Sequence, residues 1–280
     1  ITESQFVSAA SVTGVNLTGH TMSGWDLSGV DLTSATLTGA DLIGADLTNA
    51  NLTSAVLWQA TLTNANLSGA NLDGANLIDA NLTGSTITES QFVSAASVTG
   101  VNLTGHNMSG WDLSGIDLTS ATLTNATLTG ADLRQATLTG ADLIGADLTN
   151  ADLTNATPTN ATLTNATLTN ANLRYADLTD AHLTDADLTA ADLLFADLSN
   201  ANLSGSILTD TQYYNNATWT DAFYYTDNEP TWHSGMDAAW RSLVGIVPRS
   251  SLGAGSPVPE PSTLLLALIG LALLPRRRRR

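Results

Sequence analysis

Ala40-Asp41-Leu42-Ile43-Gly44 is followed directly by Ala45-Asp46-Leu47-Thr48-Asn49, and this unit recurs through most of the chain. Its general form is Ala-Asp/Asn-Leu-Thr/Ser-Gly/Asn. Leu occupies every fifth position from residue 32 to 82 and again from 113 to 203, with Pro158 as the only exception. A five-residue period rotates by about 500° around an α-helix and would scatter the leucines over its whole surface. The repeat therefore predicts a solenoid.

In an extended chain, side chains two residues apart point to the same side. The Ala and Leu of each unit therefore share one face, and the Asp or Asn between them points the opposite way. A turn at each Gly or Asn would close successive units into a narrow coil with Leu on its axis. The predicted core includes Leu42, Leu47, Leu143, Leu148, Leu178 and Leu188.

These units hold register over residues 12–210 and closely resemble the pentapeptide-repeat family. The resemblance implies an all-β fold, a right-handed quadrilateral β-helix with four pentapeptides per coil. About ten coils at the strand spacing of roughly 4.8 Å would form a rod on the order of 50 Å long. We assign residues 1–210 to this domain.

The solenoid contains an internal duplication. Residues 1–38 recur as residues 87–124 with only two differences, at an offset of 86 residues. This offset is one residue more than a whole number of pentapeptides, and the extra residue lies between Gln91 and Val98. We expect a bulge or loop there, interrupting the coil near residues 92–98.

Aromatic residues mark irregular places. Trp25 and Trp111 occupy the Ala position, where a narrow coil has no room for an indole, so we interpret them as local distortions in which the rings lie outward or plug a coil edge; a partner-binding knob is the alternative. Eight of the fifteen aromatic residues fall within 211–247. We assign this region to a C-terminal cap, since the last coil of a solenoid exposes apolar groups and unpaired backbone. An aromatic sugar-binding platform is the alternative for this cluster.

Within the cap, a short amphipathic helix is expected. Ser234 to Asp237 resembles a capping-box start, apolar residues follow at helical spacing, and Gly245 indicates the end. Residues 248–258 are rich in Ser, Gly and Pro and predict a flexible linker.

The C-terminal segment, residues 259–280, has three parts. Pro259, Glu260 and Pro261 precede an apolar stretch and then five arginines, an order that resembles the PEP-CTERM sorting signal of Gram-negative bacteria. The resemblance implies that an exosortase-type enzyme recognises and processes the protein at the Pro-Glu-Pro motif. The apolar stretch contains Leu264, Leu265, Leu266, Leu268, Ile269, Leu271, Leu273 and Leu274, and the basic stop is Arg276, Arg277, Arg278, Arg279 and Arg280.

This apolar stretch is shorter than the roughly 20 residues that span a bilayer comfortably. We therefore expect transient inner-membrane anchoring with the arginines on the cytoplasmic side, followed by transfer to the cell envelope, the surface or the extracellular space. The sequence begins at Ile1 inside a repeat, without Met and without a basic and apolar leader. We expect that the N-terminal signal peptide of such proteins is missing from this chain.

Charge and residue types exclude several functions. Ahead of Arg276 the chain has 26 acidic residues and four arginines, with no Lys and no Cys. Such a surface repels phosphates, so no nucleic-acid partner is expected.

Isolated histidines, with no nucleophile motif and no Gly-rich phosphate loop, predict no catalytic residue, no cofactor and no metal site. Aspartates one coil apart, such as Asp177 and Asp197, could bind a hard cation, but we favour relief of their repulsion by interleaved Asn, Thr and water.

Two functions remain. The favoured hypothesis is a non-enzymatic structural or protein-interaction scaffold, a rigid acidic rod that is exported to the cell envelope or extracellular matrix, with an unknown protein or polysaccharide as partner. The alternative follows from cytoplasmic pentapeptide-repeat proteins that mimic DNA and bind a DNA-processing enzyme such as gyrase. The sorting segment favours the first, because an exported rod does not meet gyrase.

Overall fold

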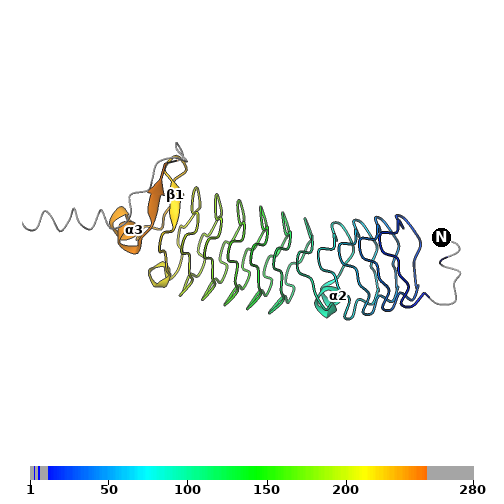
Figure 1. The fold of residues 1–280 in the computed structure, drawn as a ribbon. Coiled ribbons are helices and arrows are strands. Elements are labelled where there is room, and N and C mark those ends of the chain that lie inside the picture. The colour runs from blue at the N-terminus through cyan, green and yellow to red at the C-terminus, as the bar shows by residue number, and fades with distance from the viewer. Residues whose placement is uncertain (1–2, 4–5, 7–11, 251–280) are drawn as a thin grey trace, which may run out of the picture. The chain divides into compact units, whose positions relative to one another are not determined.

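The computed structural model describes residues 3, 6 and 12–250, and the chain divides into two units, Ile1–Arg249 and Ser250–Arg280. The first unit is a stack of four-sided coils (Figure 1). Parallel bridges join residues twenty positions apart, from Asn16 with Thr36 through Asp187 with Ile207, so each coil holds four pentapeptides. The unit is the right-handed quadrilateral β-helix that the pentapeptide pattern predicts.

Each corner of a coil is a tight turn. In the unit around Leu37, the N–H of Ala40 donates to the carbonyl of Leu37 at 3.0 Å, and Gly39 between them has a φ of 61°. A positive φ at the third residue is the requirement of a type II turn, which Gly and Asn meet most easily. Corner chemistry therefore sets the five-residue period.

Leucine fills the axis of the coils and alanine lines it. The six leucines predicted for the core are fully buried: Leu42, Leu47, Leu143, Leu148, Leu178 and Leu188. Each buried Leu side chain contributes roughly 1.5–3 kcal/mol of burial free energy. Neighbouring coils are also joined through their backbones, as where the N–H of Leu42 donates to the carbonyl of Thr61 at 2.8 Å. Stability therefore accumulates along the stack, coil by coil.

Pro158 takes the place of one axial leucine without breaking the coil. Proline has no N–H, so it cannot make the bond that each leucine makes to the next coil. The hydroxyl of Thr159 donates instead to the carbonyl of Asp177 at 3.4 Å, and this carbonyl is the acceptor that the missing N–H would have used. The neighbouring side chain thus satisfies the backbone group that proline leaves unpaired.

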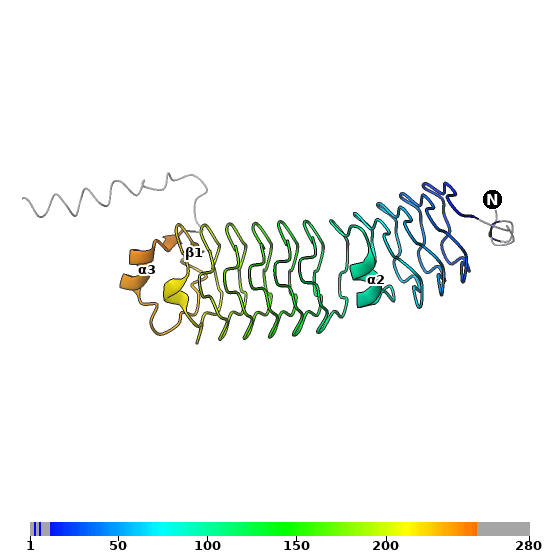
Figure 2. The ribbon, with the colours of Figure 1, turned by 90° about the horizontal axis from the view of Figure 1, so that it is seen from below.

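The coil is interrupted by α2, Glu89–Ser94, so the expected bulge or loop is in fact a helix that begins earlier than predicted. Across it, the spacing of bridged residues rises from twenty to twenty-one, as between Asn76 and Ser97. Figure 2 shows that the coils before α2 are inclined to those that follow. The helix forms because Thr88 and Gln91 make a capping box at its start.

The two tryptophans at Ala positions lie beside the axis and are covered by the protein's own chain. The ring of Phe92 in α2 packs on Trp111 with centroids 6.0 Å apart, and Phe6 packs on Trp25 at 6.1 Å. Both indoles are partly buried against the core. Intramolecular packing therefore explains them, and neither is a free knob for a partner.

The cap continues the coil before it departs from it. Gln212 still bridges at the twenty-residue spacing, to Asp192, and Thr218 and Thr231 bridge to Asp197 and Ile207 at longer spacings, so pairing with the preceding coil extends beyond the predicted end at residue 210. The cap then contains η1 (Tyr214–Asn216), β1 (Phe223–Tyr225), α3 (Ala238–Val244) and β2 (Val247–Arg249). The strands β1 and β2 pair in parallel. Trp219 is buried over the last coil, as expected of a cap.

Two predicted boundaries in the cap are wrong. The N-cap of α3 is Asp237, whose carboxylate accepts the N–H of Trp240 at 2.7 Å, so the helix starts after the stretch that begins at Ser234. It ends at Gly245 as predicted, with a φ of 90°. Pairing with β1 also holds residues 247–249 in a strand, so the linker cannot begin at residue 248. Pairing with β1, more than twenty residues earlier in the chain, determines the conformation of residues 248 and 249 despite their linker-like composition.

The remaining linker, the Pro-Glu-Pro motif, the apolar stretch and the terminal arginines lie outside the described residues. Across residues 12–250, together with residues 3 and 6, no helix combines the length and the hydropathy needed to cross a membrane.

The duplication places His20 and His106 in different surroundings. His20 is exposed, whereas His106 is 8% exposed at an inward Ala position. Burial lowers the pKa of His106 below its ordinary value of 6.5, and backbone groups nearby, first that of Ser85, oppose this shift only in part. The neutral imidazole is therefore favoured in the folded coil.

A pH-dependent loss of stability is expected from His106. Because its pKa is lower in the folded state than in the unfolded state, its contribution is fully present above about pH 6.5 and is lost as the pH falls from there. We expect the His106→Ala variant, which restores the usual repeat residue, to flatten the decline of unfolding free energy between about pH 7 and pH 5 in urea titrations. His20→Ala is the matched control and should keep the profile of the native chain; identical profiles for both variants would contradict the assignment.

Candidate interaction surface

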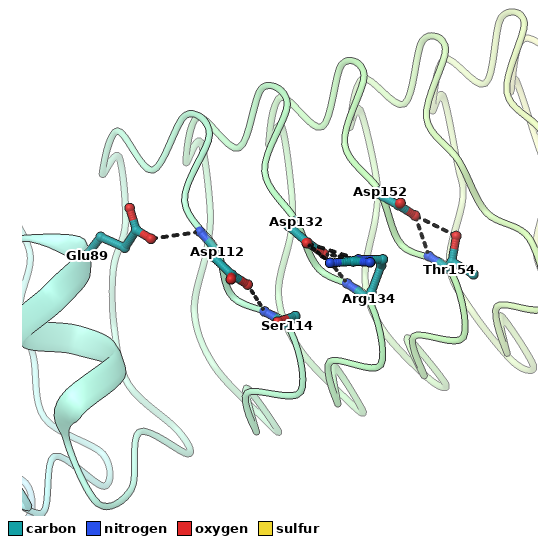
Figure 3. A network of polar contacts seen from close by, with 7 residues as sticks. All are labelled: Glu89, Asp112, Ser114, Asp132, Arg134, Asp152 and Thr154. Atoms are coloured by element: carbon teal, nitrogen blue, oxygen red, sulfur yellow. Dashed lines mark hydrogen bonds and ion pairs between the residues drawn. The ribbon is translucent and has the colours of Figure 1, made fainter.

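One side of the solenoid carries a column of outward carboxylates. Asp112, Asp132 and Asp152 bridge one to the next along three successive coils. Each is held by its own turn: the N–H of Ser114 donates to Asp112 at 3.0 Å, and the N–H of Thr154 donates to Asp152 at 3.0 Å (Figure 3). The hydrogen bonds from the side chain and backbone of Ser114 lower the pKa of Asp112. Turn donors therefore stabilise the charged carboxylates against their mutual repulsion.

Arg134 adds a positive charge to this column. Its guanidinium makes a two-pronged ion pair with Asp132 of its own unit, and Figure 3 shows it lying between Asp112 and Asp152. The hydrogen bond from Arg134 is the main cause of the lowered pKa of Asp132. Within the described part of the chain, no three acidic or histidine side chains are arranged to hold a metal ion.

The corner beside this column forms a shallow polar groove. Turn residues of three stacked coils line a cavity of about 430 Å³: Ser114, Gly115, Arg134, Gln135, Thr154 and Asn155. We call this the corner groove. Its walls offer hydroxyl, amide and guanidinium groups, so it can make many hydrogen bonds to a ligand that lies along the stack.

The same corner becomes aromatic in the next coils. Tyr175 and Phe195 follow Asn155 at the same turn position, and their ring centroids are 5.2 Å apart with planes 30° apart. Arg174 places its guanidinium 5.6 Å from the ring centre of Tyr213 and donates to Asp192 at 2.7 Å. The exposed fractions are 52% for Tyr175, 52% for Phe195 and 47% for Tyr213. We call Tyr175, Phe195 and Tyr213 the aromatic corner.

Tyr175 and Phe195 are held in strained backbone. Their φ angles are 57° and 58°, in the left-handed region that bulky residues avoid. Such a conformation costs on the order of 1–3 kcal/mol per residue and is commonly found at functional sites. The repeat uses Gly or Asn at this position in most units, as at Asn155. Two large rings kept one above the other at such a cost point to a role outside the core.

Sequence reasoning missed the aromatic corner because it treated the fifth repeat position only as a turn. A signal was present: two bulky residues, twenty residues or one coil apart, occupy a position that needs a positive φ. The cap aromatics, where a sugar-binding platform was the alternative, pack largely on one another. Tyr214 contacts Trp240 at 5.1 Å and Tyr224 contacts Trp232 at 5.4 Å between centroids.

A second groove lies on another side of the stack, beside the cap. It has a volume of about 410 Å³ and is lined by Asn160, Asp180, His182, Asn200, Phe223 and Arg249. The guanidinium of Arg249 lies 3.5 Å from the ring centre of Phe223, so this aromatic face is already occupied. His182 is exposed at an outward repeat position, as the sequence pattern predicts.

Comparison with known families relates the repeat to a described group. The profile for Pentapeptide repeats (8 copies) matches residues 10–49, 50–88, 96–135, 116–155, 141–180 and 171–210. The chain belongs to the pentapeptide-repeat family. A second profile, the PEP-CTERM protein-sorting motif, matches residues 257–280, so both predicted resemblances are confirmed.

Solved structures of other pentapeptide-repeat proteins are similar to the chain. HetL, a pentapeptide repeat protein involved in heterocyst differentiation regulation from the cyanobacterium Nostoc sp. strain PCC 7120, is 31% identical over 78% of this chain and 90% of its own, with a TM-score of 0.39. Full-length QnrB1, a plasmid-mediated fluoroquinolone resistance protein, is 17% identical over 91% of this chain and 97% of its own, with a TM-score of 0.43. No curated protein matches the chain significantly.

Proposed function

We propose that this pentapeptide-repeat protein is a non-enzymatic scaffold that is exported and presents its rod at the cell envelope or in the extracellular matrix. The observation that carries the proposal is the PEP-CTERM motif at residues 257–280, which indicates export and sorting by an exosortase. The rod supports a binding role, because three of the four exposed aromatic residues in its described part, Tyr175, Phe195 and Tyr213, gather at one corner. In this proposal the rod binds its partner through its rigid shape and its charge, and it catalyses no reaction.

The position of the last described strand supports processing after folding. The strand β2 ends at Arg249, whose carbonyl accepts the N–H of Thr226 at 2.9 Å. Pro259 therefore follows the folded rod by ten residues of chain. This separation along the chain supports processing at the motif while β2 stays paired in the cap.

Processing at the Pro-Glu-Pro motif gives the test of this function. In a host that contains an exosortase, we expect the intact mass of envelope or secreted protein to lack the segment after the motif. Glu260→Ala should abolish this mass loss and hold the full-length chain in the membrane fraction, while Glu229→Ala, a change in the cap, should be processed normally. A cytosolic protein of full mass would refute export.

The same experiment addresses the alternative of a DNA mimic. That alternative is favoured by one observation, the 25 acidic residues within residues 1–249, which give the rod a strongly negative charge. A full-length cytosolic protein would support it and would lead to a gyrase inhibition assay. Export would exclude it, because gyrase is cytoplasmic.

A further inference from the structure

The corner groove and the aromatic corner form one continuous ligand-sized surface. Equivalent turn positions stack from Gly115 through Gln135, Asn155 and Tyr175 to Phe195, one residue per coil. Tyr213 extends the aromatic end at the last coil. The surface is therefore linear and runs parallel to the axis of the stack, with hydrogen-bonding groups at one end and exposed rings at the other.

The charged residues at this corner indicate the net charge of the ligand that it can bind. Arg134 and Arg174 are the only arginines ahead of Arg241 in a chain without Lys, and both lie on this corner. A cationic ligand would find more favourable sites at the outward aspartates of the coils that have no arginine beside them, such as Asp142 and Asp147. An anionic ligand is opposed by the acidic rod, and each of the two guanidiniums is already paired with an aspartate. The ligand best suited to this corner carries no net charge.

Shape and side-chain chemistry then favour a carbohydrate. The C–H faces of a pyranose ring carry partial positive charge and stack on the negative faces of aromatic rings, while its hydroxyls pair with amide, hydroxyl and carboxylate groups. The coil spacing of roughly 4.8 Å is close to the length of one sugar residue in an extended glycan. Successive sugars would therefore meet successive coils, with little rearrangement of the rigid stack.

We propose that the corner from Gly115 to Tyr213 binds a neutral polysaccharide chain laid along the axis of the coils. Tyr175, Phe195 and Tyr213 stack against sugar rings, and Gln135 and Asn155 hydrogen-bond to hydroxyls. The strain at the two stacked rings is then the cost of presenting them at a corner that otherwise holds Gly or Asn. This proposal deepens the proposed function by naming the partner of the exported rod, and it rests on that function for its biological setting.

Affinity electrophoresis of the purified full chain tests the proposal. Native gels would contain hydroxyethylcellulose, galactomannan or dextran as neutral probes, and alginate as an anionic probe. We expect at least one neutral polymer to retard the protein and alginate to leave its mobility unchanged. The double variant Tyr175→Asn with Phe195→Asn should bind at least about tenfold more weakly, since it removes two stacking rings.

The controls separate binding from folding. Asn is the residue that the repeat itself places at this turn, so the double variant should keep the melting temperature of the native chain or exceed it. Trp58→Thr removes an exposed aromatic residue from another corner and should leave retardation unchanged. The assignment to this corner would be overturned if the Trp58→Thr variant lost retardation by the polymer as much as the double variant does, or if the double variant were retarded as much as the native chain.

Other outcomes would overturn the ligand class. Retardation by alginate alone, or by no polymer, would refute a neutral polysaccharide as the ligand. If an envelope protein cross-linked at Tyr175 and no polymer retarded the chain, the surface would be a protein-docking site instead. Because these gels use purified protein, they can fail while envelope processing succeeds. Conversely, a cytosolic full-length protein would refute export and leave a measured affinity for the polymer intact.

Discussion

Leu143→Ala should lower the free energy of unfolding by about 3 kcal/mol, the middle of the range for emptying a close-packed leucine site. Leu143 is fully buried on the axis, and its N–H donates to the carbonyl of Thr162 in the next coil at 2.8 Å. The variant keeps this backbone bond but loses the side chain that packs in the core shared with the neighbouring coils, and each coil is stabilised only by its neighbours. Urea unfolding followed by circular dichroism measures the change.

The matched control for this prediction is Leu243→Ala. Leu243 lies in α3 and is 83% exposed, so the same chemical change should alter the unfolding free energy by less than about 0.5 kcal/mol. Equal effects at the two sites would mean that axial packing does not dominate stability. A much larger loss at Leu143 would show instead that the cavity uncouples the coils on its two sides.

The coil could be predicted from sequence because a single repeated choice determines it. Leu and Ala two residues apart must share a face, and Gly or Asn at the fifth position permits the positive φ of the corner. Trp25 and Trp111 could be recognised as misfits for the same reason. Their covering by Phe6 and Phe92 could not be predicted, since it depends on where an irregular segment folds back onto the coil.

The helix α2 was missed for a different reason. The extra residue between Gln91 and Val98 indicates a break in the coil, but only the capping-box spacing of Thr88 and Gln91 indicates that the break is a helix. Six residues of helix are marginal alone. Tertiary contacts of Phe92 and Gln91 stabilise the helix, and these contacts are invisible in local sequence patterns.

The candidate surface was also beyond the repeat analysis. In the linear sequence Arg134 and Arg174 are only two isolated charges, and Tyr175 and Phe195 are only irregular occupants of the fifth repeat position. Their convergence follows from the twenty-residue coil, which brings every fourth pentapeptide to the same corner. Once the coil length is known, reading the sequence in steps of twenty reveals the surface. The ion pairs that Arg134 and Arg174 make with aspartates cannot be predicted from the sequence and are seen only in the structure.

Gln91→Glu should destabilise the chain by roughly 3–5 kcal/mol, because it leaves the carbonyl of Ala70 unpaired and adds a buried charge; the carbonyl of Leu67 still accepts the N–H of Ala70 at 2.9 Å. In the regular coil a backbone N–H reaches the carbonyl 21 residues earlier, as Asn71 does to Ala50 at 2.9 Å. The helix α2 removes that donor, and the Gln91 amide nitrogen replaces it by donating to Ala70 at 2.9 Å and to Leu67 at 2.6 Å. A carboxylate has no proton to donate to either carbonyl.

The pH dependence of stability in the Gln91→Glu variant distinguishes loss of the amide donors from a simple loss of packing. Burial and the two carbonyls should raise the pKa of the introduced carboxyl in the folded state, so the penalty is full at neutral pH and shrinks as the pH falls through that raised value. The Gln91→Glu variant should therefore regain stability on acidification relative to the native chain, whereas the control Gln59→Glu, at an exposed turn, should show neither loss nor recovery. A pH-independent deficit would mean that side-chain shape, rather than the amide donors, joins α2 to the coil before it. Recovery would instead show that one side-chain amide maintains the backbone pairing of the solenoid across its interruption.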